Sequence, residues 1–210
     1  MPIRPEREYR TMNPMQIRSL PSDGGGGDMV VEGYATTFNQ PYTLYSWDDY
    51  EVREEIDEHA FDECDMTDVI MQYDHQGRVF ARTRNNTLQL TIDEHGLKIT
   101  ADLGGTDIGK QLYGEIKGGY TDQMSFGFIV GLDERTYTED HENGKTTVLR
   151  RIKKISKLYD VSAVSIPAND QTSISARSLG NGWIEEVKAE RLRAQKRARL
   201  KLKMKMQEEK

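Results

Sequence analysis

Short segments with the pattern of β-strands, separated by turn residues, make up most of this 210-residue chain. Residues 97–103 alternate between apolar and polar side chains, and residues 29–38 are rich in β-branched and aromatic ones. Only residues 106–117 change to a helical period, with Thr106 as the N-cap and two glycines after the last turn. The pattern predicts a mainly β fold with flanking helices (α+β), built on a β-barrel or a sandwich core.

Two turns in the middle of the chain carry further predictions. Residues 79–83 and 87–91 flank an Asn-Asn pair, which is typical of a β-hairpin. Residues 74–77, which follow an apolar strand at 69–73, are predicted to be a loop.

Composition excludes several classes of protein. The single cysteine, Cys64, rules out an internal disulfide and a cysteine-based zinc site. No apolar run reaches the roughly 18 residues that a membrane helix needs, and the N-terminal residues have no apolar signal-peptide segment. We therefore expect a cytosolic protein.

The charge of the chain is distributed unevenly. The formal net charge is −6, but residues 185–210 hold ten Lys and Arg against five Glu and carry +5, which leaves −11 on the remainder. An acidic body of this kind disfavours a general nucleic-acid binder, because contacts to phosphates need clustered cations.

The chain divides into three predicted parts. Residues 1–28 form an N-terminal extension, whose Gly-rich loop lacks the Lys-Ser/Thr ending of a phosphate-binding loop. Residues 29–178 form the main domain, and residues 179–210 form a basic, helix-permissive tail. The tail is either a solvated helix or extension, or a segment that docks onto an acidic partner.

Residues 123–128 (QMSFGF) form an apolar strand that Ser125 interrupts. A buried hydroxyl without a hydrogen-bond partner costs about 1–3 kcal/mol, so Ser125 needs a partner. It is either a satisfied core serine or a nucleophile on a rigid strand, with Gly127 allowing a substrate backbone to come close.

His75 and Asp160 are the other two unusual residues. His75 follows the apolar strand 69–73 directly, at a place where a side chain is held rigidly and still open to solvent. Asp160 lies inside the apolar segment 158–166, where a bare carboxylate is costly to bury and orienting an imidazole would supply its partner. Together with Ser125 they have the composition of a nucleophile, a base and an orienting acid. Composition alone does not show that they meet, and a structural role for each stays open.

A metal site on His75 is disfavoured. The Asp74-His75 pair has no second histidine or glutamate at the spacing of a zinc motif. We predict no metal and no cofactor.

The motifs, taken in order, resemble the prohead proteases of tailed bacteriophages. That family is similar, at a distance, to assemblin, the herpesvirus capsid-maturation protease. The matching motifs run from about Val30 to Asn169 and are GYATTFN (33–39), AFD (60–62), DH (74–75), GLKI (96–99), MSFGF (124–128) and DVSAVSIPAN (160–169).

The resemblance implies an antiparallel β-barrel of the herpesvirus-protease type and the activity of a serine endopeptidase. Ser125 would be the nucleophile, His75 the general base and Asp160 the third member. The family commonly has Glu at the position of Asp160, and the herpesvirus relatives use a second histidine. His59 is therefore the alternative third member.

The resemblance also implies partners and a location. The substrates would be the scaffold protein, or the scaffolding arm of the major capsid protein, and the protease itself through autocatalytic cleavage, with a homo-oligomer as a further implication. No membrane and no specific nucleic acid is implied. The place of action would be the host bacterial cytoplasm, inside the assembling prohead. The alternatives are a catalytically silent, protease-like scaffold protein and an unrelated β-barrel binding module.

Overall fold

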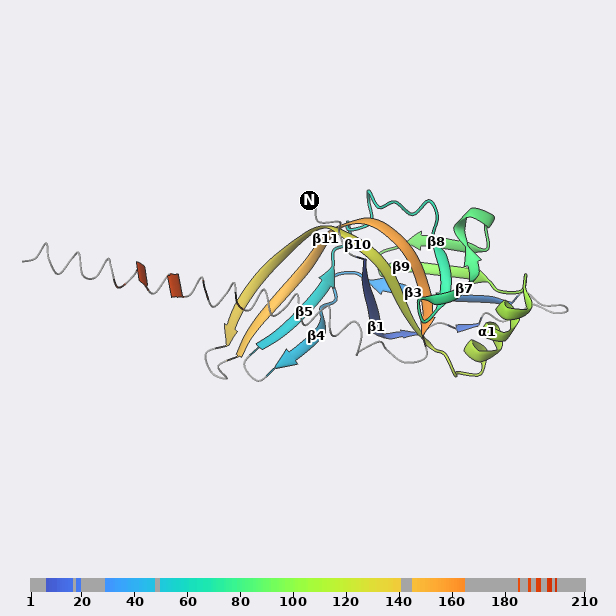
Figure 1. Cartoon of the computed structure of the whole chain (residues 1–210), viewed down its shortest axis with the longest axis horizontal. Helices are drawn as coiled ribbons and strands as arrows, with labels where there is room; N and C mark the ends of the chain where they lie inside the picture. The colour runs from blue at the N-terminus through green and yellow to red at the C-terminus, as the bar shows by residue number, and fades with distance from the viewer. Residues whose placement is uncertain are drawn as a thin grey trace, which may run out of the picture.

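The computed structural model describes residues 7–16, 18–19, 29–47, 50–140 and 145–164, together with seven residues in helical conformation between positions 185 and 199. Within these ranges the chain is mainly β with few helices, as the sequence predicts, and its strands form a seven-stranded and a four-stranded sheet (Figure 1). The Gly-rich loop at 23–28 and residues 165–169 of the last motif lie outside the described residues.

The strands follow one another along the chain as β1 (Glu8–Gln16), β2 (Arg18–Ser19), β3 (Val30–Thr37), β4 (Tyr42–Trp47), β5 (Tyr50–Ile56), β6 (Ile70–Tyr73), β7 (Gln76–Arg82), β8 (Leu88–Ile92), β9 (Gly96–Asp102), β10 (Gln123–Asp140) and β11 (Lys145–Val164). The helix α1 (Asp107–Lys117) lies between β9 and β10, and the short 3-10 helix η1 (Thr83–Asn85) lies between β7 and β8.

The long strand β11 is the axis of the seven-stranded sheet. One edge of β11 pairs with β10 in antiparallel fashion along the length of both strands. The other edge pairs in parallel with β5 and, further along, with β6. The order is β1-β10-β11-β5-β4, and β7 joins through β6. β11 therefore lies between the strand that carries Ser125 and β6, which ends just before His75.

A single hydrophobic core joins the two sheets. The four-stranded sheet has the order β2-β3-β9-β8, and Leu97 of β9 belongs to the same buried cluster as Phe126 of β10 and Leu112 of α1. A separate, smaller cluster forms around Val52 and Val148. It lies in the part of β4, β5, β10 and β11 that curves away from the other elements at the left of Figure 1.

The predicted helix is confirmed. α1 begins after Thr106, whose Oγ1 accepts a hydrogen bond from the N–H of Gly109 at 3.1 Å, and Gly119 follows its end with a φ of 73°. Leu112 and Ile116, which set the helical period in the sequence, are buried. None of the described helices is long and apolar enough to cross a membrane.

The described strands do not close into the predicted antiparallel barrel. They form two open sheets, and β5 and β6 join β11 in parallel. The reason is the length of β11. It has 20 residues, so two short strands share its second edge. Parallel neighbours need crossover connections and cannot arise from simple hairpins. The likeness to the herpesvirus protease fold stays a prediction.

The predicted hairpin around the Asn-Asn pair is wrong. Its two halves, β7 and β8, belong to different sheets, because β7 pairs with β6 and β8 pairs with β9. The helix η1 carries the chain from one sheet to the other, and Asn86 ends it with a φ of 60°. The two asparagines thus do lie in a turn, but this turn connects strands of two different sheets instead of the two strands of a hairpin.

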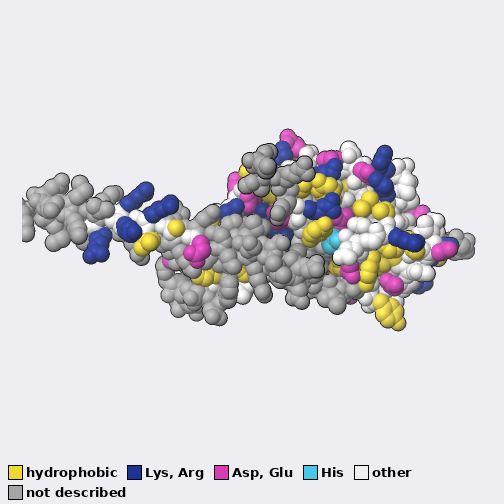
Figure 2. Space-filling model, in the orientation of Figure 1, with side chains coloured by type: hydrophobic (Ala, Val, Ile, Leu, Met, Phe, Trp, Pro, Cys, Tyr) yellow, Lys and Arg dark blue, Asp and Glu magenta, His cyan; other side chains and the backbone are white. Residues whose placement is uncertain are grey.

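Charged side chains are interspersed on the face of the molecule shown in Figure 2. Acidic, basic and hydrophobic side chains are mixed on the coloured part of this face, and Lys and Arg side chains extend from the described residues of the C-terminal part. The predicted division into residues 1–28, 29–178 and 179–210 stays a prediction.

Candidate active site

Ser125 lies in β10 with a strand on each side. Its backbone pairs with Thr11 of β1 and with Ser162 of β11. Phe126 and Phe128 are buried in the core, where their rings stack with centroids 4.6 Å apart. Because side chains alternate along a strand, Ser125 points to the opposite face. The hydroxyl is held on a rigid element and is 1% exposed.

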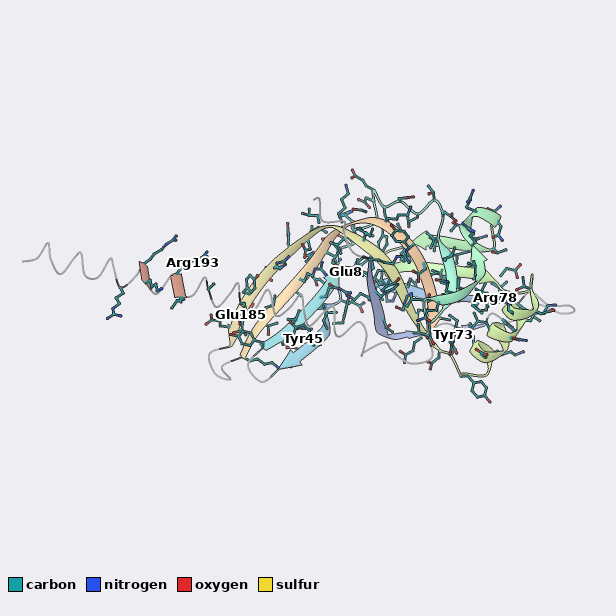
Figure 3. All side chains as sticks on the ribbon, in the orientation of Figure 1. Glu8, Tyr45, Tyr73, Arg78, Glu185 and Arg193 are labelled. Atoms are coloured by element: carbon teal, nitrogen blue, oxygen red, sulfur yellow. The ribbon has the colours of Figure 1, made fainter. Side chains whose placement is uncertain are left out.

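His75 lies in a two-residue turn, where the sequence predicted a loop. Tyr73 at the end of β6 (Figure 3) pairs with Gln76 at the start of β7, so Asp74 and His75 alone connect the strands. Their φ angles are 48° and 57°, and two successive positive values occur in the type I′ turns of hairpins. The N–H of Asp74 donates to the carbonyl of Ala163 at 3.0 Å, which ties the turn to β11.

Asp160 lies on β11 and is 1% exposed. Its Oδ1 contacts Nδ1 of His75 and accepts a hydrogen bond from the hydroxyl of Ser162 at 3.0 Å. Its Oδ2 is buried without a hydrogen bond, and Nη1 of Arg7 lies 3.7 Å away. That distance allows ionic attraction but is too long for a hydrogen bond. The predicted need of this buried carboxylate for a partner is met mainly by His75.

The three predicted site residues form one hydrogen-bonded chain. Nε2 of His75 lies 2.6 Å from Oγ of Ser125, while Nδ1 of the same ring contacts Oδ1 of Asp160. A carboxylate at Nδ1 keeps a proton on that nitrogen, which leaves the lone pair of Nε2 facing the hydroxyl. The arrangement can therefore move a proton from a serine to an imidazole.

His59 lies apart from this chain of contacts. Its imidazole is 72% exposed, with Nδ1 3.2 Å from Asp62 and Nε2 3.8 Å from Glu58. Asp160, and not His59, therefore contacts His75 in the structure. His59 lies among carboxylates at the surface. Within the described ranges, no group of three or more His, Cys, Asp or Glu is placed to hold a metal ion.

Gly127 is required by close packing around the acid. A Cβ atom there would overlap Oδ2 of Asp160 and lie 2.8 Å from Cε1 of Tyr9. The ring of Tyr9 in turn lies against His75, with centroids 4.4 Å apart. We expected Gly127 to admit a substrate backbone. What comes close in this structure is the carboxylate of Asp160 on one side and β1 on the other.

A buried ion cluster, formed by Glu8, Arg10, Glu54 and Arg150, lies beside the site (Glu8 is labelled in Figure 3). Arg10 donates to the carboxylate of Glu54 at 2.5 and 3.0 Å, and Arg150 donates to Glu8 and Glu54 at 2.7 and 2.9 Å. Burial alone would lower the pKa of Arg10, but Glu54 outweighs it and raises that pKa above its ordinary value. Burial would likewise raise the pKa of Glu8, and its bonds to the two arginines hold that pKa below the usual value.

The sequence did not point to β1 or to Ser162 as parts of the site. Arg7, Tyr9 and Arg10 approach the other side chains through long-range pairing, and residues 1–14 show too little periodicity to predict it. Ser162 could have been found, because a residue two positions from Asp160 on a strand shares its face.

Comparison with known proteins agrees with the sequence motifs. The chain matches the family model of the caudovirus prohead serine proteases over residues 15–183. Comparison with curated proteins gave no match, and neither did comparison with solved structures. The similarity to assemblin therefore stays a prediction. On the extent of the family match and the order of its motifs, this chain belongs to the caudovirus prohead serine protease family.

Proposed function

We propose that this chain is a serine endopeptidase that cleaves the scaffold protein, or the scaffolding arm of the major capsid protein, and also itself during prohead maturation. The observation that supports the proposal most is the hydrogen-bonded chain Ser125–His75–Asp160 in a member of this protease family. Family membership alone would not identify which residues carry out the reaction.

In the proposed mechanism, Nε2 of His75 takes the proton of Ser125 while Oγ attacks the scissile carbonyl carbon. The imidazolium then gives that proton to the leaving amine as the C–N bond breaks, and an acyl-serine remains. A water molecule, activated by the same nitrogen, hydrolyses the acyl-serine and restores the hydroxyl. Asp160 keeps Nδ1 protonated and stabilises the imidazolium, and the hydroxyl of Ser162 fixes the Oδ1 atom of Asp160.

The proposed place of action is the inside of the assembling prohead in the host cytoplasm. The basic tail, residues 179–210, would dock the protease there, be removed by self-cleavage, or both. Membership of the prohead protease family supports this location, and the positive charge of the tail supports docking onto an acidic partner.

The test is co-expression of the capsid protein with Ser125→Ala, and with Ser156→Ala as a matched control on an exposed position of β11. Removing a serine nucleophile lowers kcat by about 10⁶-fold in a comparable hydrolase, so we expect no processed capsid protein on a gel with Ser125→Ala and normal processing with Ser156→Ala. Unchanged processing with Ser125→Ala would refute the proposal. Lost processing with normal prohead assembly would exclude a purely scaffolding role.

A further inference from the structure

The strand β1 covers Ser125. It forms the edge of the seven-stranded sheet and pairs with β10 from Glu8 opposite Phe128 to Thr11 opposite Ser125. The hydroxyl of Ser125 lies 2.9 Å from the carbonyl oxygen of Arg10, and almost none of that side chain is exposed. A peptide cannot reach Oγ while β1 is in place.

The edge of β10 that β1 occupies is also the edge that an extended substrate would need. β11 pairs with the other edge along its whole length, so a peptide could add to β10 only where β1 now lies. Strand addition of this kind binds a peptide through its main chain and places its carbonyl groups at fixed positions. Pairing by β1 puts the carbonyl of Arg10 at the nucleophile, as a substrate would put its own.

The contact with Arg10 competes with the transfer of the serine proton. The hydroxyl of Ser125 has one proton, and both the carbonyl oxygen of Arg10 and Nε2 of His75 lie within hydrogen-bond distance of Oγ. While that proton is donated to the carbonyl, the lone pair of Nε2 has no proton to accept, and the imidazole cannot act as the base. β1 thus opposes the reaction both by covering Oγ and by holding its proton.

The side chain of Arg10 lies among buried carboxylates, an environment that suits a basic residue. Its guanidinium is buried against the carboxylate of Glu54, and the hydroxyl of Tyr42 donates to the same carboxylate at 2.5 Å. If β1 left, Glu54 would keep its bonds to Tyr42 and Arg150 but would lose two donors. A guanidinium forms two parallel bonds to a carboxylate, so an arginine of a substrate would restore them.

The attachment of β1 to β10 is short. Regular pairing covers four residues, from Glu8 to Thr11, and the register shifts before Gln16 meets Gln123. An edge strand with one neighbour and a short ladder can leave without opening the core, whereas β10 and β11 cannot. Besides this ladder, the buried ion cluster and the contacts of Tyr9 with His75 and of Arg7 with Tyr159 retain β1.

We propose that β1 occupies the substrate position on β10 and holds the protease inactive, and that a substrate replaces it as an extended strand with a basic residue in the place of Arg10. This inference rests on the proposed function of Ser125. In this inference β1 is an internal inhibitor of the protease, and Glu54 is the residue that selects the basic side chain of the substrate.

The first test measures how fast a fluorophosphonate, which labels activated serines without regard to peptide sequence, reacts with the purified full-length chain. Arg10→Ala and Glu8→Gln each remove anchors of β1, and Arg78→Ala is the control, since Arg78 lies exposed on β7. We expect labelling of Ser125 at least tenfold faster in the two β1 variants than in the wild type or the control. Glu8→Gln is the milder change and keeps the test valid if Arg10→Ala does not fold.

Two outcomes separate this inference from the proposed function. Equal labelling rates in the wild type and in Glu8→Gln would overturn the inhibitory role of β1 and leave the protease standing. If Ser125 were labelled in none of the proteins, the proposed function itself would be contradicted, and the inference with it.

The second test concerns the selection of a basic side chain by Glu54. A peptide with the sequence of residues 7–14 (REYRTMNP) is added to Glu8→Gln, next to a peptide that carries citrulline, an uncharged arginine analogue, in the place of Arg10. We expect the arginine peptide to slow labelling at a concentration at least tenfold lower than the citrulline peptide. Equal potency of the two peptides would overturn the selection of a basic residue.

Discussion

Replacing Arg150 by methionine should destabilise the fold much more than the same change at its neighbour Arg151. The side chain of Arg150 is 5% exposed and donates to three carboxylates, those of Glu8, Glu54 and Asp133. Removing one partner of a buried ion pair costs about 3–5 kcal/mol, because the charge left behind stays buried. Since Arg10 still pairs with Glu8 and Glu54, we expect the lower end of that range, about 3 kcal/mol.

Arg151 serves as the control because it is the next residue on the same strand and binds two carboxylates, those of Glu55 and Asp57. Its side chain is 38% exposed, and its partner Asp57 keeps a second bond, from Lys153. Because the arginine end of these pairs is open to solvent and Asp57 keeps its bond to Lys153, we expect the loss of Arg151 to cost about 1 kcal/mol. The two substitutions therefore compare a buried arginine with a partly exposed one on the same strand.

The assay is urea unfolding of both variants and the wild type, followed by circular dichroism. With a slope of about 3 kcal/mol per M, the midpoint should fall by roughly 1 M for Arg150→Met and by roughly 0.3 M for Arg151→Met. Raising the salt concentration should shrink the second shift more than the first, because exposed charges are screened. Equal midpoints for the two variants would refute the argument that burial decides the cost.

Two further predictions concern Gly127 and Asp57. Gly127→Ala should cost about 1–3 kcal/mol of stability and lower peptidase activity by about 10²-fold, because its methyl group displaces the carboxylate of Asp160. Gly114→Ala, which adds its methyl group to open space on α1, should instead raise the unfolding midpoint. A higher unfolding midpoint for Gly127→Ala than for Gly114→Ala would refute the packing argument. Burial alone would raise the pKa of Asp57, but hydrogen bonds led by Lys153 lower it from 3.8 to about 2. Asp57 should therefore contribute about 1–2 kcal/mol above about pH 4, after allowance for partly exposed partners, and lose it as the pH falls through about 2. Asp57→Asn should remove that part of the acid sensitivity, and an unchanged acid profile would contradict the assignment.

The sequence predicts best where a signal is local. Thr106 and the glycines after residue 117 set the ends of α1 through caps that involve only nearby backbone groups, and the prediction is confirmed. Ser125 and Asp160 could be selected because each is a polar residue in an apolar strand, which has to find a partner. The sequence could not show that they share one partner, since 50 residues separate His75 from Ser125 and 85 separate it from Asp160.

The predictions that failed depend on which strands become neighbours. The Asn-Asn pair has the local chemistry of a turn, but the partners of β7 and β8 are chosen by the sheets on which they pack. The same holds for β1, whose polar residues reach the site only because β10 offers a free edge. Whether a sheet closes into a barrel is likewise decided by long-range register and by the length of β11, and no single segment encodes it.

The turn that carries His75 limits how stable this fold can become. Asp74 and His75 are two successive residues with positive φ, and a left-handed conformation costs a residue with a side chain about 1–2 kcal/mol. Glycine at position 75 would relieve that strain and would also remove the imidazole from Ser125. Under the proposed mechanism, selection of this chain for heat resistance alone would therefore favour inactive variants at this turn. A search for more stable forms of the protein has to score activity and stability together, or look for its gains at other positions.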